Sequence, residues 1–261
     1  MSTFKLTDDH IREFEANGYI IATGLFDTEE VEILGAVARA DEELKAQVRS
    51  RKDAEGGITT LSLSNELGDD IYSAIVRCRR MTDTMERLLG DEVYHYHHKM
   101  NMKAPYVGGA WEWHQDYGYW YNNGCLFPDM ASCLIAIDRA SKENGCLQVV
   151  KHSHLLGRMD HMKVGDQTGA DPERVTAAVE RLPLEYCELE PGAAVFFHAN
   201  TLHRSDQNTS ENPRWAFICC YNSKHNDPYK DSKHPRYSPL EIWDDTKILE
   251  LGHQHWNRMS S

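Results

Sequence analysis

The sequence lacks several features that define other classes of protein. It has no long run of apolar residues, so no segment is predicted to cross a membrane. Its first residues are polar and charged and lack the apolar core of a secretory leader, so we expect the chain to be cytoplasmic. No internal repeat and no low-complexity tract interrupts its 261 residues.

Paired cysteines and a basic surface are also missing. The seven cysteines are an odd number and none forms a CxxC pair, so we expect reduced thiols and no disulfide framework. Forty-one aspartates and glutamates outnumber 28 lysines and arginines, which gives a formal net charge of −13. Nucleic-acid-binding domains need a basic face, so this balance argues against that partner. It leaves a small-molecule substrate open, because one local cation is enough to hold an anion.

The first third of the chain is predicted to be mostly helical. Asp27 and Glu30 form a capping box, which predicts a long helix from there to about Val48. The other elements expected in this part are a helix at 7–17, a strand at 19–21, a polar loop at 51–57 and helices at 69–80 and 83–89.

From residue 92 onward the pattern changes to short strands bounded by clusters of Gly, Pro, Asn and Asp. The predicted strands are 94–102, 112–117, 131–138, 146–150, 193–198 and 215–221, with one helix at 171–181. Helices followed by many strands indicate an α+β fold, here a double-stranded β-helix, the cupin-like jelly-roll barrel, buttressed by the N-terminal helices. We expect a single domain over 1–261, with a helical part at about 1–90, a barrel at about 92–222 and a C-terminal extension at about 223–261.

The segment from His114 to Asp116 carries the first chemical signal. Residues two apart on a strand point to the same face, so both side chains would project into the barrel. A neutral imidazole and a carboxylate supply two facial ligands, and a third ligand with open positions completes the usual non-heme iron(II) site. His203 is the best third candidate, because it follows a strand and a turn 87 residues beyond Asp116.

Arg214 lies 11 residues after His203. The residues between them are rich in turn formers, so the chain should reverse and place Arg214 on an adjacent strand. A guanidinium close to a metal can hold a carboxylate through two parallel hydrogen bonds, which suits the distal carboxylate of 2-oxoglutarate.

These motifs resemble the phytanoyl-CoA dioxygenase family of iron(II)/2-oxoglutarate oxygenases, which includes ectoine hydroxylases. The resemblance reaches from the N-terminus to about Tyr221. The segments that carry it are 6–26, 113–120, 143–147 and 203–208 with Arg214. It implies a dioxygenase that uses Fe(II), 2-oxoglutarate and O2 to hydroxylate a small organic metabolite, with release of succinate and carbon dioxide.

The resemblance also assigns roles residue by residue. It implies that His114, Asp116 and His203 bind the iron. Arg214 matches the residue that pairs with 2-oxoglutarate, and Ser205 matches a hydroxyl that supports it. The resemblance further places Lys99 and Asn101 near the co-substrate or the substrate, and Trp120 in the wall of the substrate pocket. One departure is His152, which stands where glycine is usual, and it puts the conformation of that loop in question.

Aromatic residues are dense around the His114 motif. Strand parity places Trp111 and Trp113 opposite His114, which predicts that both belong to the core. Tyr117 and Trp120 are the better candidates for the pocket, where they could pack on an apolar or cationic substrate.

Other histidines offer a rival metal site. His95 and His97 share a strand face and could imitate the HxH of a cupin, but no carboxylate follows at close spacing. We therefore expect them, together with His98, to be packing or pocket-edge residues.

Two other functions are compatible with the pattern. One is a cupin-type metal-dependent isomerase or epimerase that needs neither oxygen nor 2-oxoglutarate. The other is a non-catalytic barrel that binds a ligand. Halogenation is disfavoured, because Asp116 occupies the position that a halogenase leaves free for halide.

Overall fold

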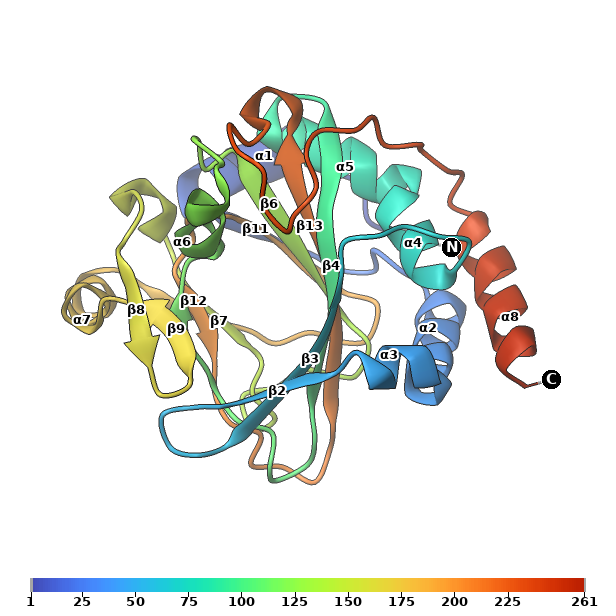
Figure 1. Cartoon of the computed structure of the whole chain (residues 1–261), viewed down its shortest axis with the longest axis horizontal. Coiled ribbons are helices and arrows are strands. Elements are labelled where there is room, and N and C mark those ends of the chain that lie inside the picture. Colours follow the sequence, from blue (N-terminus) through green and yellow to red (C-terminus); the bar gives the residue numbers. More distant parts are fainter. Residues whose placement is uncertain (1, 261) are drawn as a thin grey trace.

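Two antiparallel sheets face each other across the interior of the protein (Figure 1). The computed structural model describes residues 2–260. The larger sheet has the order β1 (Tyr19–Ala22), β11 (Ala194–His198), β6 (Met130–Ala136), β13 (Arg214–Ser223), β4 (Val93–Lys103), β3 (Ile58–Ser64) and β2 (Arg49–Lys52). The smaller sheet has the order β10 (Leu184–Cys187), β7 (Leu147–Val150), β12 (His203–Ser205) and β5 (Trp111–His114). The predicted jelly-roll barrel is confirmed.

Helices and a hairpin complete the chain. The hairpin consists of β8 (His161–Val164) and β9 (Gln167–Ala170). The helices are α1 (Asp8–Asn17), α2 (Thr28–Ala40), α3 (Glu42–Ala46), α4 (Ile71–Arg77), α5 (Arg79–Leu89), α6 (Asp116–Trp120), α7 (Pro172–Arg181) and α8 (Lys247–Met259). Within residues 2–260, none of these helices has the length and apolar character needed to cross a bilayer.

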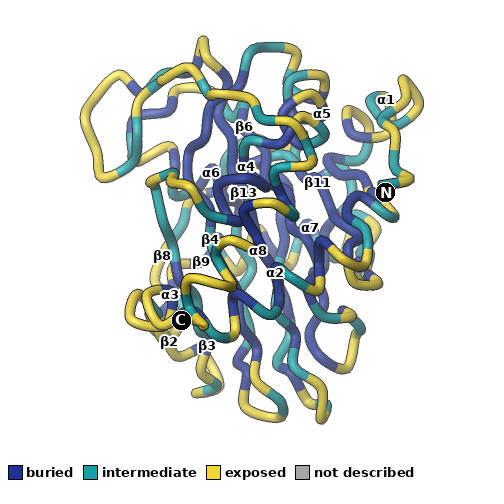
Figure 2. The backbone as a smooth tube through the Cα atoms, turned by 90° about the vertical axis from the view of Figure 1, so that its right-hand side faces the viewer, coloured by how far each residue is buried: buried dark blue, intermediate teal, exposed yellow. Residues whose placement is uncertain are grey.

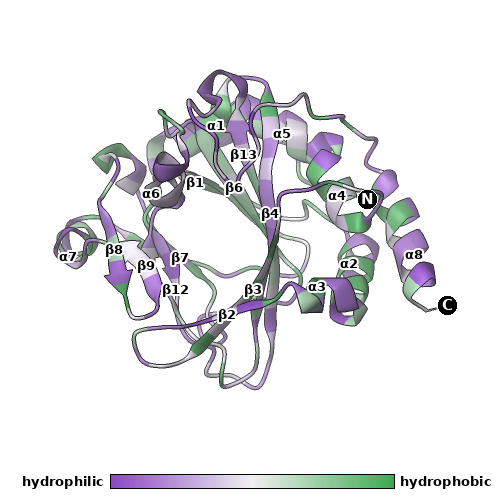
Figure 3. Ribbon diagram, in the orientation of Figure 1, coloured by the Kyte–Doolittle hydropathy of each residue, from purple (hydrophilic) through white to green (hydrophobic). Residues whose placement is uncertain are grey.

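The central strands β6 and β13 consist almost entirely of buried residues (Figure 2). On β13, Phe217 and Cys219 face the helical side and join a core with residues of α2, α4, α5 and α8. Ala216 and Ile218 alternate with them and line the barrel interior with residues of β7 and β11. Because β13 is covered on both faces, its sequence is a nearly continuous run of apolar residues. By contrast, α8 shows both hydrophobic and hydrophilic residues along its coil (Figure 3).

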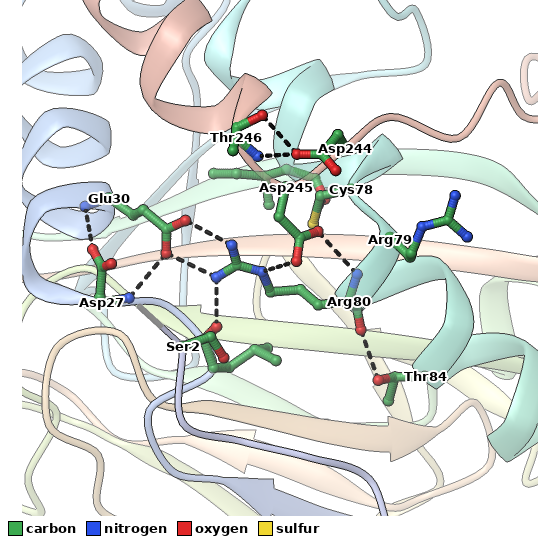
Figure 4. Close-up of polar contacts among 12 residues, drawn as sticks. Ser2, Asp27, Glu30, Cys78, Arg79, Arg80, Thr84, Asp244, Asp245 and Thr246 are labelled. Carbon is green, nitrogen blue, oxygen red and sulfur yellow. Dashed lines mark hydrogen bonds and ion pairs between the residues drawn. The ribbon is translucent and has the colours of Figure 1, made fainter.

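Arg80 at the start of α5 contacts α2, the loop before α2 and the C-terminal extension (Figure 4). Its Nη2 lies 2.7 Å from Oε1 of Glu30 on α2, and its Nε lies 3.0 Å from Oδ2 of Asp245 in the C-terminal extension. Its Nη1 also donates to the carbonyl oxygen of Leu25 at 2.9 Å.

Two predicted helices are wrong in their extent. The helix expected to reach Val48 ends at Ala40, because Asp41 is extended and accepts a hydrogen bond from the backbone N–H of Leu44 to cap α3. The helix expected at 69–80 is interrupted at Cys78, which forms a bridge to Trp243 of the C-terminal extension.

Two other segments also differ from expectation, and a third contains a helix for which no prediction was made. The loop predicted at 51–57 is the end of β2 and a tight turn into β3, and neither strand of this hairpin was predicted in the helical N-terminal part. The strand predicted at 112–117 stops at His114, because helix α6 begins at Asp116. The C-terminal extension carries α8, which packs on α2 and α4.

Candidate active site

Three metal-binding side chains converge inside the barrel. His114 ends β5, Asp116 opens α6 and His203 opens β12. His203 is paired with His114 across the small sheet, and candidate ligand atoms of the three residues all lie within 4.8 Å of one another. Two imidazoles and one carboxylate grouped in this way form the donor set that non-heme iron(II) prefers.

A turn, and not strand alternation, brings Asp116 to this point. Gln115 between the two ligands is fully buried, and its side chain donates to the carbonyl oxygen of Asn200 and accepts from the N–H of Met159. Its backbone N–H donates to Nε2 of His161 at 3.0 Å. These bonds fix the turn from strand to helix, so the carboxylate faces the cavity although it is not part of the strand.

Both histidines present the same nitrogen to the centre. Nδ1 of His114 lies 2.6 Å from the carbonyl oxygen of Glu112, and Nδ1 of His203 lies 2.8 Å from that of Thr201. A carbonyl only accepts, so each Nδ1 carries the proton and each Nε2 keeps its lone pair for a metal. Burial lowers the pKa of both imidazoles, which keeps them neutral.

Asp116 is held in its ionised form. Burial alone would raise its pKa, but the Lys99 ammonium and the hydrogen bond from Ser132 lower the pKa below its usual value. Lys99 Nζ lies 3.7 Å from Oδ1, and the hydroxyl of Ser132 donates to Oδ2 at 2.7 Å. One carboxylate oxygen is thereby oriented by Ser132, while the other faces Lys99 and the histidines.

Arg214 and Ser205 leave buried donors without partners. The Nε and Nη2 atoms of Arg214 donate to the carbonyl oxygen of Gly145 at 3.2 and 2.8 Å, which fixes the guanidinium plane. Its Nη1 and the Oγ of Ser205 have no partner within the described part of the chain. Burial lowers the pKa of Arg214 to about 10, so it is still a cation at neutral pH. Unpaired buried donors of this kind are costly, and they fit an anionic group bound from the cavity.

A cavity of about 290 Å³ joins these two sites. Its lining includes the three candidate ligands, four of the other predicted residues (Lys99, Asn101, Ser205 and Arg214) and the predicted Trp120. Trp120 also packs edge-on against Tyr96 and His97.

Two aromatic predictions are wrong. Tyr117 does not line the cavity, because its hydroxyl points away and donates to the carbonyl oxygen of Leu126 at 2.6 Å. Tyr119 lines the cavity in its place. Trp111 was expected in the core but also lines the cavity and donates from Nε1 to Oδ1 of Asn101 at 3.2 Å. The pairing of β5 with β12 shifts register beside it, which reverses the alternation from which the core position was predicted.

The cavity also contains residues that were not assigned to it from the sequence. Arg49 and Arg51 reach it from the unpredicted strand β2, and His234 reaches it from the C-terminal extension. His97, expected as a packing or pocket-edge residue, lines the wall beside His234, with ring centroids 5.2 Å apart.

The loop at His152 keeps the conformation that glycine would give it. His152 has a φ of 66°, in the left-handed region that favours glycine. Its backbone N–H donates to the carbonyl oxygen of Asn17 at 3.0 Å, and its Nδ1 lies 2.6 Å from that of Ala16. These bonds to the end of α1 hold the unusual residue in place.

Comparison with known proteins agrees with the fold and the site. The family model for phytanoyl-CoA dioxygenase (PhyH) matches residues 14–216. The L-proline trans-4-hydroxylase of Streptomyces griseoviridis is 32% identical over 190 residues, which cover 67% of this chain and 69% of the relative. The ectoine dioxygenase of Bordetella bronchiseptica is 28% identical over 249 residues, covering 88% and 80%. The crystal structure of EctD from S. alaskensis with 2-oxoglutarate and 5-hydroxyectoine superposes with a TM-score of 0.76 at 20% identity, covering 94% and 89%.

Fold, site and relatives define an iron- and 2-oxoglutarate-dependent dioxygenase that acts on small metabolites. The chain belongs to the phytanoyl-CoA dioxygenase family.

Proposed function

We propose that this dioxygenase hydroxylates a free small metabolite, with Fe(II) held by His114, Asp116 and His203. In this proposal 2-oxoglutarate extends from the metal to Arg214 and Ser205. The observation that carries the proposal is one cavity that contains both a facial donor set and the buried, unpaired Nη1 of Arg214. When bound, iron activates O2 and 2-oxoglutarate, so that one oxygen atom enters succinate and the other enters the substrate, with loss of carbon dioxide.

The surrounding residues orient the reactants and exclude water. Lys99 neutralises Asp116 and lies beside the metal position, and Asn101 is fixed by its bond from Trp111. We assign both to the co-substrate side of the cavity. Trp120 forms part of the substrate wall, with Tyr119 in the place first expected for Tyr117.

Hydroxylation is the outcome we favour over isomerisation. The two relatives described above are named as a hydroxylase and a dioxygenase. L-Proline and ectoine are therefore the first substrates to test, by following succinate release with Fe(II), 2-oxoglutarate and O2 present.

Iron stoichiometry tests the assigned ligands. We expect the anaerobically reconstituted protein to bind one Fe(II) per chain, and H114A or D116A to lose most of that iron while the barrel stays folded. H97A is the matched control, because His97 is a buried histidine of the same cavity outside the proposed triad. Metal analysis with circular dichroism gives both readings. Unchanged iron in H114A and D116A would place the metal elsewhere.

We further propose that the protein acts in the cytoplasm. All seven cysteines are buried and unpaired, which suits a reducing compartment. Fractionation of the source cells tests this, and recovery of the protein outside the cytoplasm would contradict it.

A further inference from the structure

The charges around the cavity are the reverse of those of the whole chain. The chain has a net charge of −13. The cavity, however, is lined by one acid, Asp116, and by five cations: Arg49, Arg51, Lys99, Arg204 and Arg214. This local excess of positive charge favours an anionic ligand and raises its concentration near the cavity.

Three of the five cations already have partners within the protein. The pairs are Lys99 with Asp116, Arg204 with Asp206, and Arg214 with the carbonyl oxygen of Gly145. Moreover, Arg214 is assigned to 2-oxoglutarate in the proposed function. The guanidinium groups of Arg49 and Arg51 are different, because neither has a hydrogen-bond or ion-pair partner among residues 2–260.

Arg49 and Arg51 lie on one face of β2, the outermost strand of the large sheet. Arg49 pairs with Leu61 of β3, which also lines the cavity. Tyr119 of α6 also lines the cavity. Burial raises the pKa of that phenol, and the charge of Arg51 acts in the opposite direction. The two arginines therefore face the same space as the aromatic wall.

The hairpin that carries these arginines is anchored. The buried carboxylate of Asp53 in its turn accepts from the backbone N–H of Gly57 and from that of Ala110, both at 2.7 Å. The carbonyl oxygen of Lys52 accepts from the N–H of Asp166 at 3.3 Å. Because the backbone is held at these points, the two side chains start from a fixed strand, which reduces the entropy lost on binding.

We propose that the substrate is a small organic acid whose carboxylate or phosphonate is bound by Arg49 and Arg51. This inference rests on the proposed function and adds the class of substrate. The planar fork of arginine matches the oxygens of either acid group. With its acid group held on β2, the rest of the substrate extends toward the iron ligands along the wall that contains Tyr119 and Trp120.

A purely structural role for the two arginines makes a different prediction. Charged residues on an edge strand protect a sheet from pairing with another chain. In that case, removing Arg49 and Arg51 increases aggregation but leaves the binding of acids unchanged.

Calorimetric titration of the full chain tests the proposal. The anaerobic protein, loaded with Fe(II) and 2-oxoglutarate, is titrated with the twenty proteinogenic L-amino acids, ectoine and methylphosphonate, which separates carboxylates from phosphonates. The acid that binds with the highest affinity is then compared with its own amide or ester. We expect at least one acid to bind, and its neutral derivative to bind at least about tenfold more weakly, since a charge-assisted hydrogen bond is lost.

Variants assign that binding to the hairpin. We expect R51Q to weaken acid binding about tenfold and the R49Q/R51Q double variant about 100-fold. K52Q is the matched control, because Lys52 is a cation on the same exposed strand that does not line the cavity. All three should bind 2-oxoglutarate as the wild type does.

Three results would overturn the inference while leaving the proposed function intact. They are equal binding of the acid and its neutral derivative, unchanged acid binding in R49Q/R51Q, and binding of none of the acids by a protein that binds 2-oxoglutarate. A wild-type protein that fails to bind 2-oxoglutarate would overturn both.

Discussion

At the scale of single residues, the candidate iron site is prepared for a cation by groups that are not ligands themselves. The carbonyl oxygens of Glu112 and Thr201 fix the tautomers of the two histidines. Ser132 orients Asp116, and Lys99 keeps it ionised. The protein thereby pays the cost of orienting its donors during folding, which leaves more of the binding free energy for the metal.

A surface histidine gives a pH-dependent prediction. His225 lies between two carboxylates, with Nε2 2.8 Å from Asp129 and Nδ1 2.7 Å from Asp91, and these bonds raise its pKa. Because the pKa is higher in the folded than in the unfolded state, the stabilisation is fully present below the unfolded value of about 6.5. It is lost as pH rises through the folded value.

We therefore expect H225Q to lower the free energy of unfolding at pH 6, by less than about 1 kcal/mol because the ring is half exposed. The difference from the wild type should shrink toward pH 9. Urea titrations at pH 6, 7.5 and 9 measure it. A difference that stays constant or grows with pH would contradict the account.

At the scale of elements, helix α6 is packed so closely that its glycine has no room for a side chain. A Cβ atom at Gly118 would lie 2.0 Å from Cε1 of His161. In an open helix, replacing glycine by alanine stabilises by about 1 kcal/mol. Here we expect G118A to destabilise by about 1–3 kcal/mol and to weaken iron binding, because α6 begins with Asp116.

Two further variants isolate this clash. G68A is the control, because a Cβ there meets Asp70 only at an ordinary contact distance of 3.4 Å. H161A removes the obstructing ring, so G118A should cost less in that background than in the wild type. Chemical unfolding of the wild type, G118A, H161A and the G118A/H161A double variant measures the coupling. Equal costs of G118A in both backgrounds would show that His161 is not the obstacle.

The sequence predicted those parts of the site that depend on local patterns. His114, Asp116, His203 and Arg214 are recognisable by spacing and turn residues, and the structure brings all four to one cavity. The alternation of side chains between the two faces of a strand does not hold just before or just after His114. The register shift beside Trp111 reverses the strand faces, and Asp116 begins a helix.

Residues brought in by long-range packing left no such signal. The strand that carries Arg49 and Arg51 is polar throughout, so it shows no apolar alternation. His234 comes from a segment without helix or strand, and it is held by stacking on Tyr96 with ring centroids 4.8 Å apart. Likewise, the helix break at Cys78 depends on the distant Trp243.

At the scale of the whole molecule, Arg80 connects the N-terminal helices to the C-terminal extension (Figure 4). Its partner Glu30 is buried, so truncating the arginine leaves an uncompensated charge in the protein interior. We expect R80A to lower the free energy of unfolding by about 3 kcal/mol. R87A is the control: its ion pair with Asp8 is exposed and should contribute less than about 1 kcal/mol. Similar losses in the two variants by urea unfolding would contradict this role.

The account of the whole enzyme depends on 2-oxoglutarate being held between the metal and Arg214. Truncating one side of a buried charged pair costs about 2–5 kcal/mol, or roughly 30- to 5,000-fold in affinity. We therefore expect R214A to lose 2-oxoglutarate binding by this factor while its iron content stays unchanged. R214K should recover only part of the affinity, because an ammonium keeps the charge but lacks the planar fork.

The most direct measurement is an anaerobic titration of the iron-loaded protein with 2-oxoglutarate, following the weak visible charge-transfer band that chelation produces. The account predicts a saturating band in the wild type, and in R214A the same band only at much higher 2-oxoglutarate concentrations. A wild type without the band, or R214A with unchanged affinity, would contradict the proposed co-substrate site.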